Sequence, residues 1–364
     1  MRTVVVGGFG NFGSRICRAL AADPGIHVIA AGRNPDTGRS SPKVQGARLD
    51  LESPDFPSNL RHLSPDLVIH CAGPFQSQDY RVPEAAVSAG AHYIDLADGR
   101  KFVTRFAAHF DAKAREAGLF MTSGASTVPA LSSAVIDDLL GRFRQIEDIR
   151  IAIAPGQRAP RGIATIAGVF SYAGKSFKWW RDGAWCDVWG WQELVRMRFA
   201  GLGMRWAAAC DIPDLELFPS RYSGVKTVEF HAALELGIQH AALWMAAALH
   251  KAGLPLPIER AAPLMNGAAS LLDRFGSDKG GMLVSLTGTR IDGARRQVEW
   301  HLTADENHGP EIPCMAAILL ARKLARGEIA VRGAYPCMGF LDLREFAPQF
   351  AQWRISTAIE EEVA

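Results

Sequence analysis

The sequence predicts an α/β protein, with a doubly wound parallel sheet in its first part and an inserted α+β domain containing an antiparallel or mixed sheet. Three observations predict this class. Short apolar runs alternate with helical patterns in the first third of the chain, as expected of right-handed crossovers between parallel strands. A glycine-rich turn follows the first apolar run. Further along, two alternating runs flank Asp292-Gly293, which is a strong hairpin signal.

The first part is expected to contain six strands, each a short apolar run bounded by turn signals. They cover residues 3–6, 27–31, 47–49, 67–71, 92–96 and 119–122. The first helix runs from Phe12 to the turn at Asp23, because apolar residues recur there at helical spacing. Two more helices cover residues 82–89 and 102–117, and a glycine follows each of them, in the position where helices commonly end.

The second part has a different pattern. A helix opens at Thr127, with Pro129 in its first turn, where proline suits the backbone. Strands are expected over residues 149–154, 165–172, 227–232, 282–290 and 297–303. The hairpin formed by the last two of these strands can offer an edge strand to a partner, so a homodimer is one possibility. A final helix begins at Pro313 and stops at Gly327.

Composition and charge exclude several classes. The chain has 364 residues, 48% of them hydrophobic and 21% charged, which is ordinary for a globular protein. Forty Lys and Arg against 38 Asp and Glu leave a net charge of +2, which gives no electrostatic footprint for an anionic membrane or for a nucleic acid, so no nucleic-acid partner is expected. No membrane span is expected either, although a peripheral membrane contact stays open. The longest apolar stretch, Ala241–Leu249, is far shorter than the ~20 residues that span a bilayer.

The cysteines and histidines indicate neither a disulfide framework nor a metal site. The six cysteines are widely spaced without a C-x-x-C pair, and the histidines show no H-E-x-x-H spacing. The N-terminus shows no pattern typical of a signal peptide. We therefore expect reduced thiols, a cytoplasmic location and no bound metal.

The sharpest motif is a glycine-rich turn between the first strand and the first helix. A G-x-G-x-x-G pattern in this context is typical of dinucleotide-binding Rossmann domains. Gly8 permits the tight turn, Gly10 lets the backbone approach a pyrophosphate, and Gly13 lets the helix pack on the strand. The helix N-terminus then offers N–H groups to the phosphates. The predicted cofactor-binding residues here are Gly8, Phe9, Gly10, Asn11, Phe12 and Gly13.

The end of the second strand favours NADP over NAD. An NAD site places a carboxylate on the ribose hydroxyls about 20 residues after the glycines, whereas this strand ends with Arg33 and Asn34. Arg33 can pair with a 2′-phosphate; the alternative is a solvated loop residue. Asp50, after the third strand, can accept from the adenine amino group or cap a turn.

Ligands of such sheets lie beyond the carboxyl ends of the strands, which indicates where the rest of the site lies. The fourth strand leads into small residues that let the nicotinamide half approach the backbone, namely Cys71, Ala72, Gly73, Pro74 and Phe75. Asp95 lies at the end of the fifth strand, Asp98 follows that strand, and Gly124 follows the sixth. Asp98 and Tyr80 are the candidate proton donors, although Asp98 can equally cap the next helix.

Candidate substrate residues in the second part are Arg205, Arg221 and Tyr222, which can bind a carboxylate; the alternative is ordinary ion pairs. They flank a tryptophan-rich segment that can hold a ring or an acyl chain but more often forms core. This segment contains Trp179, Trp180, Trp185, Trp189, Trp191 and Trp206.

Five segments together resemble the saccharopine dehydrogenase-like family. They are residues 4–13, 71–76, 92–99, 123–129 and 333–337. The resemblance implies a Rossmann domain interrupted by an α+β domain, with the C-terminal helix returning to the first domain. We therefore expect a Rossmann NADP-binding domain over residues 1–128, an inserted substrate or dimerisation domain over 129–307 and a returning helical segment over 308–364.

The resemblance also implies NAD(P)-linked hydride transfer to or from a C=N or C–N bond of a small, amino-acid-like substrate. Two alternatives stay open. Some relatives look like NADPH-dependent reductases of enoyl or keto groups on lipid or polyketide precursors, and a chain that kept the nucleotide site alone would be a non-catalytic NADP-binding sensor. The fold by itself does not choose among them.

Overall fold

The computed structural model describes the whole chain except residues 36–42, 161, 255–266, 268–269 and 364. Two compact units divide the chain. The first joins Met1–Leu131 to Glu311–Leu341, and the second joins Ser132–Pro310 to Asp342–Ala364. The sequence predicts boundaries at residues 128 and 307, close to the first two observed changes of unit.

The sheet of the first unit is entirely parallel, with strand order β15-β6-β5-β4-β1-β2-β3. From β1 the chain first adds strands on one side and then returns to add the others on the opposite side, so the topological switch point lies between β1 and β4. The strands are β1 (Arg2–Val6), β2 (His27–Gly32), β3 (Val44–Arg48), β4 (Leu67–His70), β5 (His92–Asp95), β6 (Phe120–Ser123) and β15 (Gly333–Pro336).

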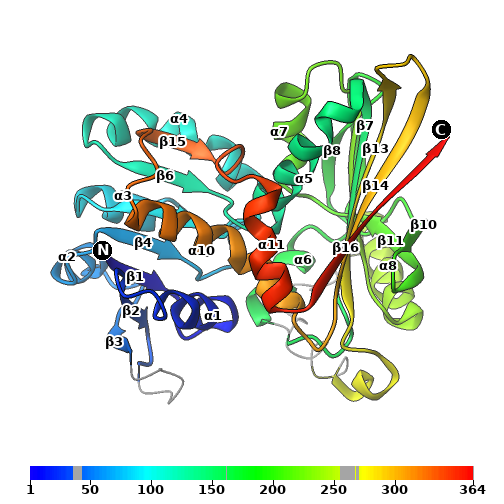
Figure 1. Cartoon of the computed structure of the whole chain (residues 1–364). Coiled ribbons are helices and arrows are strands. Elements are labelled where there is room, and N and C mark those ends of the chain that lie inside the picture. Colours follow the sequence, from blue (N-terminus) through cyan, green and yellow to red (C-terminus); the bar gives the residue numbers. More distant parts are fainter. Residues whose placement is uncertain (36–42, 161, 255–266, 268–269, 364) are drawn as a thin grey trace. The chain divides into compact units, whose positions relative to one another are not determined.

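The helices of this unit bury apolar faces. The buried positions of α1 are Gly13, Ile16, Cys17 and Leu20, and this helix packs against α10, beside which it lies in Figure 1. Gly90 and Gly118, with φ of 71° and 67°, follow α3 and α4, as the sequence predicts. The helices are α1 (Asn11–Leu20), α2 (Phe56–His62), α3 (Arg81–Ser88), α4 (Arg100–Glu116) and α10 (Ile312–Ala325).

The second unit is built on a mixed sheet with the order β10-β11-β12-β7-β13-β14-β16, to which the hairpin β8–β9 is attached through β12. Among the strand pairs of the described residues in this sheet, β7 and β12 alone run parallel. The strands are β7 (Phe143–Ala154), β8 (Ser176–Arg181), β9 (Ala184–Trp189), β10 (Val195–Phe199), β11 (Gly203–Ala209), β12 (Thr227–Ala233), β13 (Gly280–Arg290), β14 (Arg295–Ala304) and β16 (Ile355–Val363).

Helices pack on this sheet from several segments: α5 on β13, α7 on β12, α8 on β11 and α11 on β16. They are α5 (Ser132–Leu139), α6 (Ile163–Ser171), α7 (Asp214–Arg221), α8 (Gly237–Lys251) and α11 (Leu343–Gln352). Short helical turns occur at Thr127–Leu131, Leu140–Arg142, Asp273–Phe275 and Gly309–Glu311. No helix of the described residues has the length and apolar character needed to cross a membrane.

One predicted strand is wrong, and one predicted segment belongs only in part to the unit expected for it. Residues 165–172 form most of α6 and not a strand, because a short apolar run has no period that separates a strand from a buried helix. The segment 308–364 returns to the first unit only in part. Helix α10 and strand β15 do so, whereas α11 and β16 belong to the second unit, where β16 pairs along β14.

The predicted hairpin forms as β13 and β14, with Gly293 at φ 84° and the Asp292 carboxylate accepting from the N–H of Ala294. Its predicted free edge does not exist in the monomer. Strand β7 covers one side of the hairpin and β16 covers the other, so both of its strands are internal. The edge-strand argument for a homodimer is therefore removed, and oligomeric state stays a prediction.

Candidate functional site

The glycine loop lies at the switch point of the first sheet, where ligands of doubly wound sheets bind. The left-handed residue of the turn is Gly7, with φ of 79°, and not Gly8 as the motif suggests. Gly8 is needed for another reason, because a Cβ there would lie 2.8 Å from Ala30 Cα on β2. A Cβ on Gly13 would lie 2.2 Å from the Gly7 carbonyl oxygen, so this glycine lets α1 start against the turn.

Helix α1 begins at this loop without a side-chain cap. Gly10 is its N-cap residue, is exposed and donates its N–H to the Gly7 carbonyl. An N-cap glycine leaves the end of the helix open to an anion, which the first-turn N–H groups and the helix dipole attract. The loop therefore fits the pyrophosphate of a dinucleotide.

The loops beyond neighbouring strands touch one another along the carboxyl edge of this sheet. A Cβ on Gly7 would lie 2.9 Å from the Ala72 nitrogen, so the loops after β1 and β4 are in contact. A Cβ on Gly99 would lie 2.8 Å from the Phe75 oxygen, which brings together the loops after β4 and β5. Glycines thus permit a continuous backbone surface from the glycine loop to Gly99.

The predicted adenosine end contains both aromatic and basic groups. The Phe9 ring packs over Gly32, where a Cβ would lie 3.0 Å from the ring, and near Gly46. Arg33 and Asn34 are exposed directly after β2. Asp50 caps a turn, since its carboxylate accepts from the N–H of Glu52 at 3.1 Å. The structure thus shows a turn-capping contact of Asp50, and its contact with an adenine amino group stays a prediction.

The predicted nicotinamide end is formed by residues 71–75. Burial raises the pKa of the Cys71 thiol well above its usual value, and the neighbouring Cys314 and Cys17 raise it further. A neutral thiol is a poor nucleophile, so this environment favours a structural role for Cys71. Phe75 is buried and meets the His70 ring edge-on, with centroids 4.9 Å apart. All six cysteines are free thiols.

A buried polar network lies behind these loops. Asp95 is fully buried, and its Oδ1 accepts from the N–H groups of Ala97 and Gly124, at 2.9 and 2.8 Å, and from the Ser123 hydroxyl at 3.0 Å. Burial raises the pKa of Asp95 to about 6, and these hydrogen bonds oppose the rise. His70 Nδ1 lies 3.1 Å from the Tyr93 hydroxyl, and burial lowers the pKa of His70 to about 3.

The two candidate proton donors have different surroundings. Asp98 Oδ1 accepts from the Gln76 amide at 3.1 Å, and burial raises the pKa of Asp98 above its usual value. Tyr80 packs in an aromatic cluster and donates its hydroxyl proton to the Phe102 carbonyl at 2.8 Å. Burial raises the pKa of Tyr80 to about 12. Asp98 is therefore better suited to exchange a proton than Tyr80.

The structure pairs the three predicted substrate residues with carboxylates of the second unit. Arg221 Nη2 donates to Asp137 at 2.6 Å, and the Tyr222 hydroxyl donates to the same carboxylate at 2.9 Å. Arg205 is buried, and its guanidinium lies 3.5 Å from both Glu235 Oε1 and the Pro155 oxygen. Because both of its contacts are long, Arg205 is paired less tightly than Arg221.

The tryptophan-rich segment is divided between core and surface. Trp179 and Trp191 are almost fully buried, at 0% and 1% exposure, which is the core role that the sequence left open. Trp185 and Trp206 are exposed, and Trp206 stacks with the Arg196 guanidinium, 5.7 Å from the ring centre. The segment thus provides core packing on one side and exposed rings on the other, where Trp185 meets Trp180 edge-on with centroids 5.1 Å apart.

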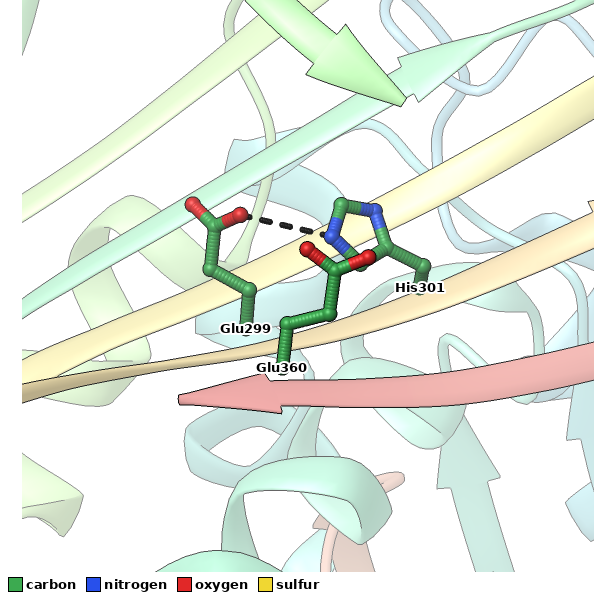
Figure 2. A group of neighbouring side chains, drawn as sticks. All are labelled: Glu299, His301 and Glu360. Carbon is green, nitrogen blue, oxygen red and sulfur yellow. Dashed lines mark ion pairs between the residues drawn. The ribbon is translucent and has the colours of Figure 1, made fainter. Parts of the chain in front are cut away.

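Sequence reasoning missed a group of titratable side chains on the second sheet. Figure 2 shows Glu299 and His301 of β14 beside Glu360 of β16. His301 is 1% exposed, and its Nε2 lies 3.3 Å from Glu299 Oε2. Its Nδ1 accepts from the N–H of Ala200 at 3.3 Å, so a neutral ring carries its proton on Nε2. A proton there, and not a lone pair, faces the carboxylates, which disfavours metal ligation.

An ion pair that the sequence did not indicate ties the glycine loop to α10. Arg15 Nη1 donates to the carbonyl oxygen and to Oδ1 of Asn11, both at 2.7 Å, and Arg15 Nε lies 2.8 Å from Glu311 Oε1. Spacing along the chain carries no signal for this contact, because Glu311 follows the whole inserted unit.

Comparisons with known proteins agree with this geometry. Residues 4–122 match the family model described as "Saccharopine dehydrogenase NADP binding domain". No curated protein sequence matches the chain closely enough to count as a relative.

Two solved structures show a similar fold over nearly the whole chain. Apo saccharopine dehydrogenase (L-Glu forming) from Saccharomyces cerevisiae has a TM-score of 0.69 at 12% identity, over 99% of each chain. Homospermidine synthase from Legionella pneumophila, in complex with NAD, has a TM-score of 0.60 at 10% identity, over 100% of this chain and 92% of the other. At these identities the likeness shows the fold. The family model adds that residues 4–122 are similar to a saccharopine dehydrogenase NADP-binding domain, which agrees with the resemblance seen in the sequence.

Proposed function

We propose that this protein is an NADP-dependent oxidoreductase of the saccharopine dehydrogenase-like type, acting on a C=N or C–N bond of a small, amino-acid-like substrate. One observation carries the proposal. The glycine loop, the loop after β4 and the loop after β5 form one continuous surface at the switch point of a sheet whose sequence matches an NADP-binding domain. Such a surface fits a dinucleotide extended along the edge of the sheet.

Each part of the cofactor has a group on the protein that suits it. Residues 8–13 would hold the pyrophosphate on N–H groups, and Phe9 would form a wall of the adenosine site. Arg33 and Asn34 would bind the 2′-phosphate, because a guanidinium there suits an anion that a carboxylate would repel. Residues 71–75 and Gly124 would line the nicotinamide end. The bound nicotinamide supplies the hydride chemistry, and the protein supplies position and a proton.

Asp98 is the proton donor or acceptor in this proposal. Its raised pKa moves the carboxyl toward the operating pH, as general acid–base chemistry requires, and the Gln76 amide fixes its orientation. Arg205 would bind a substrate carboxylate, since its two existing contacts are both long. Arg221 and Tyr222 are weaker candidates because both already share Asp137.

Calorimetry with NADP⁺ and NAD⁺ tests the cofactor. We expect tighter binding of NADP⁺, and we expect Arg33→Asp to weaken NADP⁺ binding by about tenfold or more while NAD⁺ binding is kept. Arg61→Asp is the matched control, because Arg61 is an exposed arginine of the same unit on α2. Unchanged NADP⁺ affinity in Arg33→Asp would refute the 2′-phosphate assignment, and no heat with either nucleotide would refute the function.

NADPH oxidation tests the reaction class. One panel combines 2-oxo acids with amines, and a second panel contains enoyl and keto acyl compounds. Turnover with the first panel, lost in Asp98→Asn, supports the proposal. Turnover with the second panel alone would indicate a reductase of acyl substrates, and tight NADPH binding without any turnover would indicate a sensor.

A further inference from the structure

We propose that Asp95 is a positioning residue of this site, and that its carboxylate holds together the two loops that carry Asp98 and Gly124. The inference rests on the proposed function for its catalytic meaning. Its structural part, that one buried side chain fixes both loops, is tested separately below. Asp95 does not touch the reacting atoms in this proposal; it acts through the loops.

The place of Asp95 explains why a side chain is needed. The register of β5 with β6 consists of Tyr93↔Met121 and Ile94↔Thr122, and it stops there. Beyond this register the two segments separate. One continues as the loop 96–99, and the other runs from Ser123, the last residue of β6, to Ser126. Buried N–H groups on separating chains need acceptors, because an unpaired buried N–H costs free energy comparable to a lost hydrogen bond. The carboxylate of Asp95 accepts these N–H groups in place of the main-chain carbonyls that a paired strand would provide.

A single oxygen accepts from both loops. Asp95 Oδ1 accepts from the N–H of Ala97 on one side, and from the N–H of Gly124 and the hydroxyl of Ser123 on the other. The main-chain oxygen of Asp95 also accepts from the N–H of Ala125 at 2.8 Å. Hydrogen bonds to a charged acceptor are about twice as strong as neutral ones, so this oxygen is a strong common anchor.

Each loop also has a second contact at some distance from Asp95. The Asp95 carboxylate and this second contact together fix the position of the loop. Gly124 has φ of 86°, and a Cβ there would lie 2.5 Å from Pro129 Cδ. In the other loop, Gly99 packs against the Phe75 oxygen and Asp98 binds the Gln76 amide. The loop with Asp98 is therefore held at one end by Asp95 and at the other by the loop after β4.

The charge of Asp95 changes within a useful pH range, while its neighbours stay neutral. The titratable groups near it include Tyr93, Tyr80, Cys71 and Cys337, and burial raises the pKa of each of them. They also include His70, the register partner of Asp95 on β4, whose pKa burial lowers to about 3. The pKa of Asp95 is raised to about 6. Below this pH the carboxyl is neutral and anchors the loops less strongly, and above it the carboxylate is fully formed.

Hydrogen exchange measured by mass spectrometry tests the structural part on the full chain without ligand. In Asp95→Ala we expect amides of residues 96–99 and 123–126 to exchange at least about tenfold faster, with the rest of the first unit unchanged. Asp111→Ala is the matched control, because Asp111 also accepts a backbone N–H, from Ala334, and lies outside these loops. Unchanged exchange in both loops of a folded Asp95→Ala protein would overturn the proposal.

The pH dependence of NADP⁺ affinity between pH 5 and 8 tests the role in binding. Asp95→Asn keeps an acceptor at Oδ1 but has no charge to lose. The 2′-phosphate titrates in the same range, so the difference between wild type and variant is the measured quantity. We expect wild type to lose at least threefold more affinity than Asp95→Asn on acidification through pH 6.

The outcomes separate the two proposals. Identical pH profiles of wild type and a folded Asp95→Asn would refute a positioning role of the charge. If wild type binds no NADP⁺, the proposed function fails, and the exchange experiment alone decides whether Asp95 holds the loops. If Asp95→Ala does not fold, Asp95→Asn supplies both measurements. Amides of the two loops should then exchange faster in Asp95→Asn than in wild type at pH above 6, where wild type carries the charge, and at equal rates below pH 6.

Discussion

The carboxyl edge of the first sheet and the polar face of the second sheet hold their charged groups in different ways. At the first edge, helix α1 begins at Gly10 without a side-chain cap, and glycines bring the loops into contact. On the second sheet, Glu229 is paired with Arg150 and Arg181, and Glu360 is paired with Arg198. Charges that side chains satisfy among themselves leave little for a ligand, whereas backbone cradles without side chains are open to one.

The largest expected effect follows from Gly13→Ala, which disrupts the contact between the glycine loop and the start of α1. The new Cβ would lie 2.2 Å from the Gly7 oxygen, so the loop or the helix must move. We expect NADP⁺ affinity to fall more than about 100-fold, because the phosphate N–H groups shift with the helix. Calorimetry measures the affinity, and circular dichroism checks the fold. In the control Gly25→Ala, the Cβ meets no described atom within 4 Å, and affinity should be unchanged.

The next effect concerns a fully buried carboxyl group of the second unit. Asp214 is fully buried with its carboxylate on the Ser132 hydroxyl, and burial raises its pKa to about 7. Because the folded pKa lies above the unfolded one, the native state holds the proton more tightly. The free energy of unfolding should therefore fall by up to about 4 kcal/mol as pH rises from 4 to 7.

Urea unfolding of Asp214→Asn across that range measures this contribution. We expect the variant to lose the decline and to exceed wild-type stability most clearly near pH 8. The exposed Asp182→Asn serves as control and should follow wild type. A variant that declines with pH as wild type does would show that Asp214 is not the group responsible.

A smaller effect tests whether the returning helix α10 supports the nucleotide loop. Arg15→Ala removes the hydrogen bonds to Asn11 and the pair with Glu311, and should weaken NADP⁺ binding about tenfold. Glu311→Gln should weaken it less, and the double variant should resemble Arg15→Ala. Strictly additive losses would show that the pair does not act as a unit. Arg18→Ala, on the exposed side of α1, controls for the loss of a nearby positive charge.

The smallest effect is expected on the second sheet, at Glu299→Gln. Contact with His301 lowers the pKa of Glu299, so its stabilising contribution is present at neutral pH and is lost as pH falls through the folded pKa. Because Glu299 is partly exposed, we expect a change of less than about 1 kcal/mol at pH 7 and none in NADP⁺ affinity. Added Zn²⁺ should not raise the melting temperature; saturable stabilisation, lost in His301→Ala, would instead reveal a metal site.

Local signals predicted the first unit well. The glycines, the apolar runs and the strand-end rule place residues 8–13, 71–75 and Asp98 along one edge from sequence alone. The sequence did not reveal that Gly7 takes the left-handed position, because several adjacent glycines can each do so. The assignment of Arg33 and Asn34 to the cofactor stays a prediction.

Contacts between distant segments were beyond sequence reasoning. Glu299 and His301 are two apart on a strand and share a face, but the register that brings Glu360 beside them depends on β16 pairing with β14. The bond between Arg15 and Glu311 depends in the same way on where α10 packs. The strand prediction for residues 165–172 was wrong for another reason. An apolar run without a clear period fits either a strand or a buried helix.

The position of the outer strand β15 late in the sequence has a consequence for how the first unit folds during synthesis. This strand lies parallel beside β6, yet it leaves the ribosome only after the segment Ser132–Pro310, the larger part of the second unit, has been made. Domains usually fold in the order in which they are translated, but this nucleotide-binding unit must wait with an open sheet edge at β6. The emerging chain is therefore most exposed to mispairing between residues 123 and 333, and a chaperone would act most usefully in that interval.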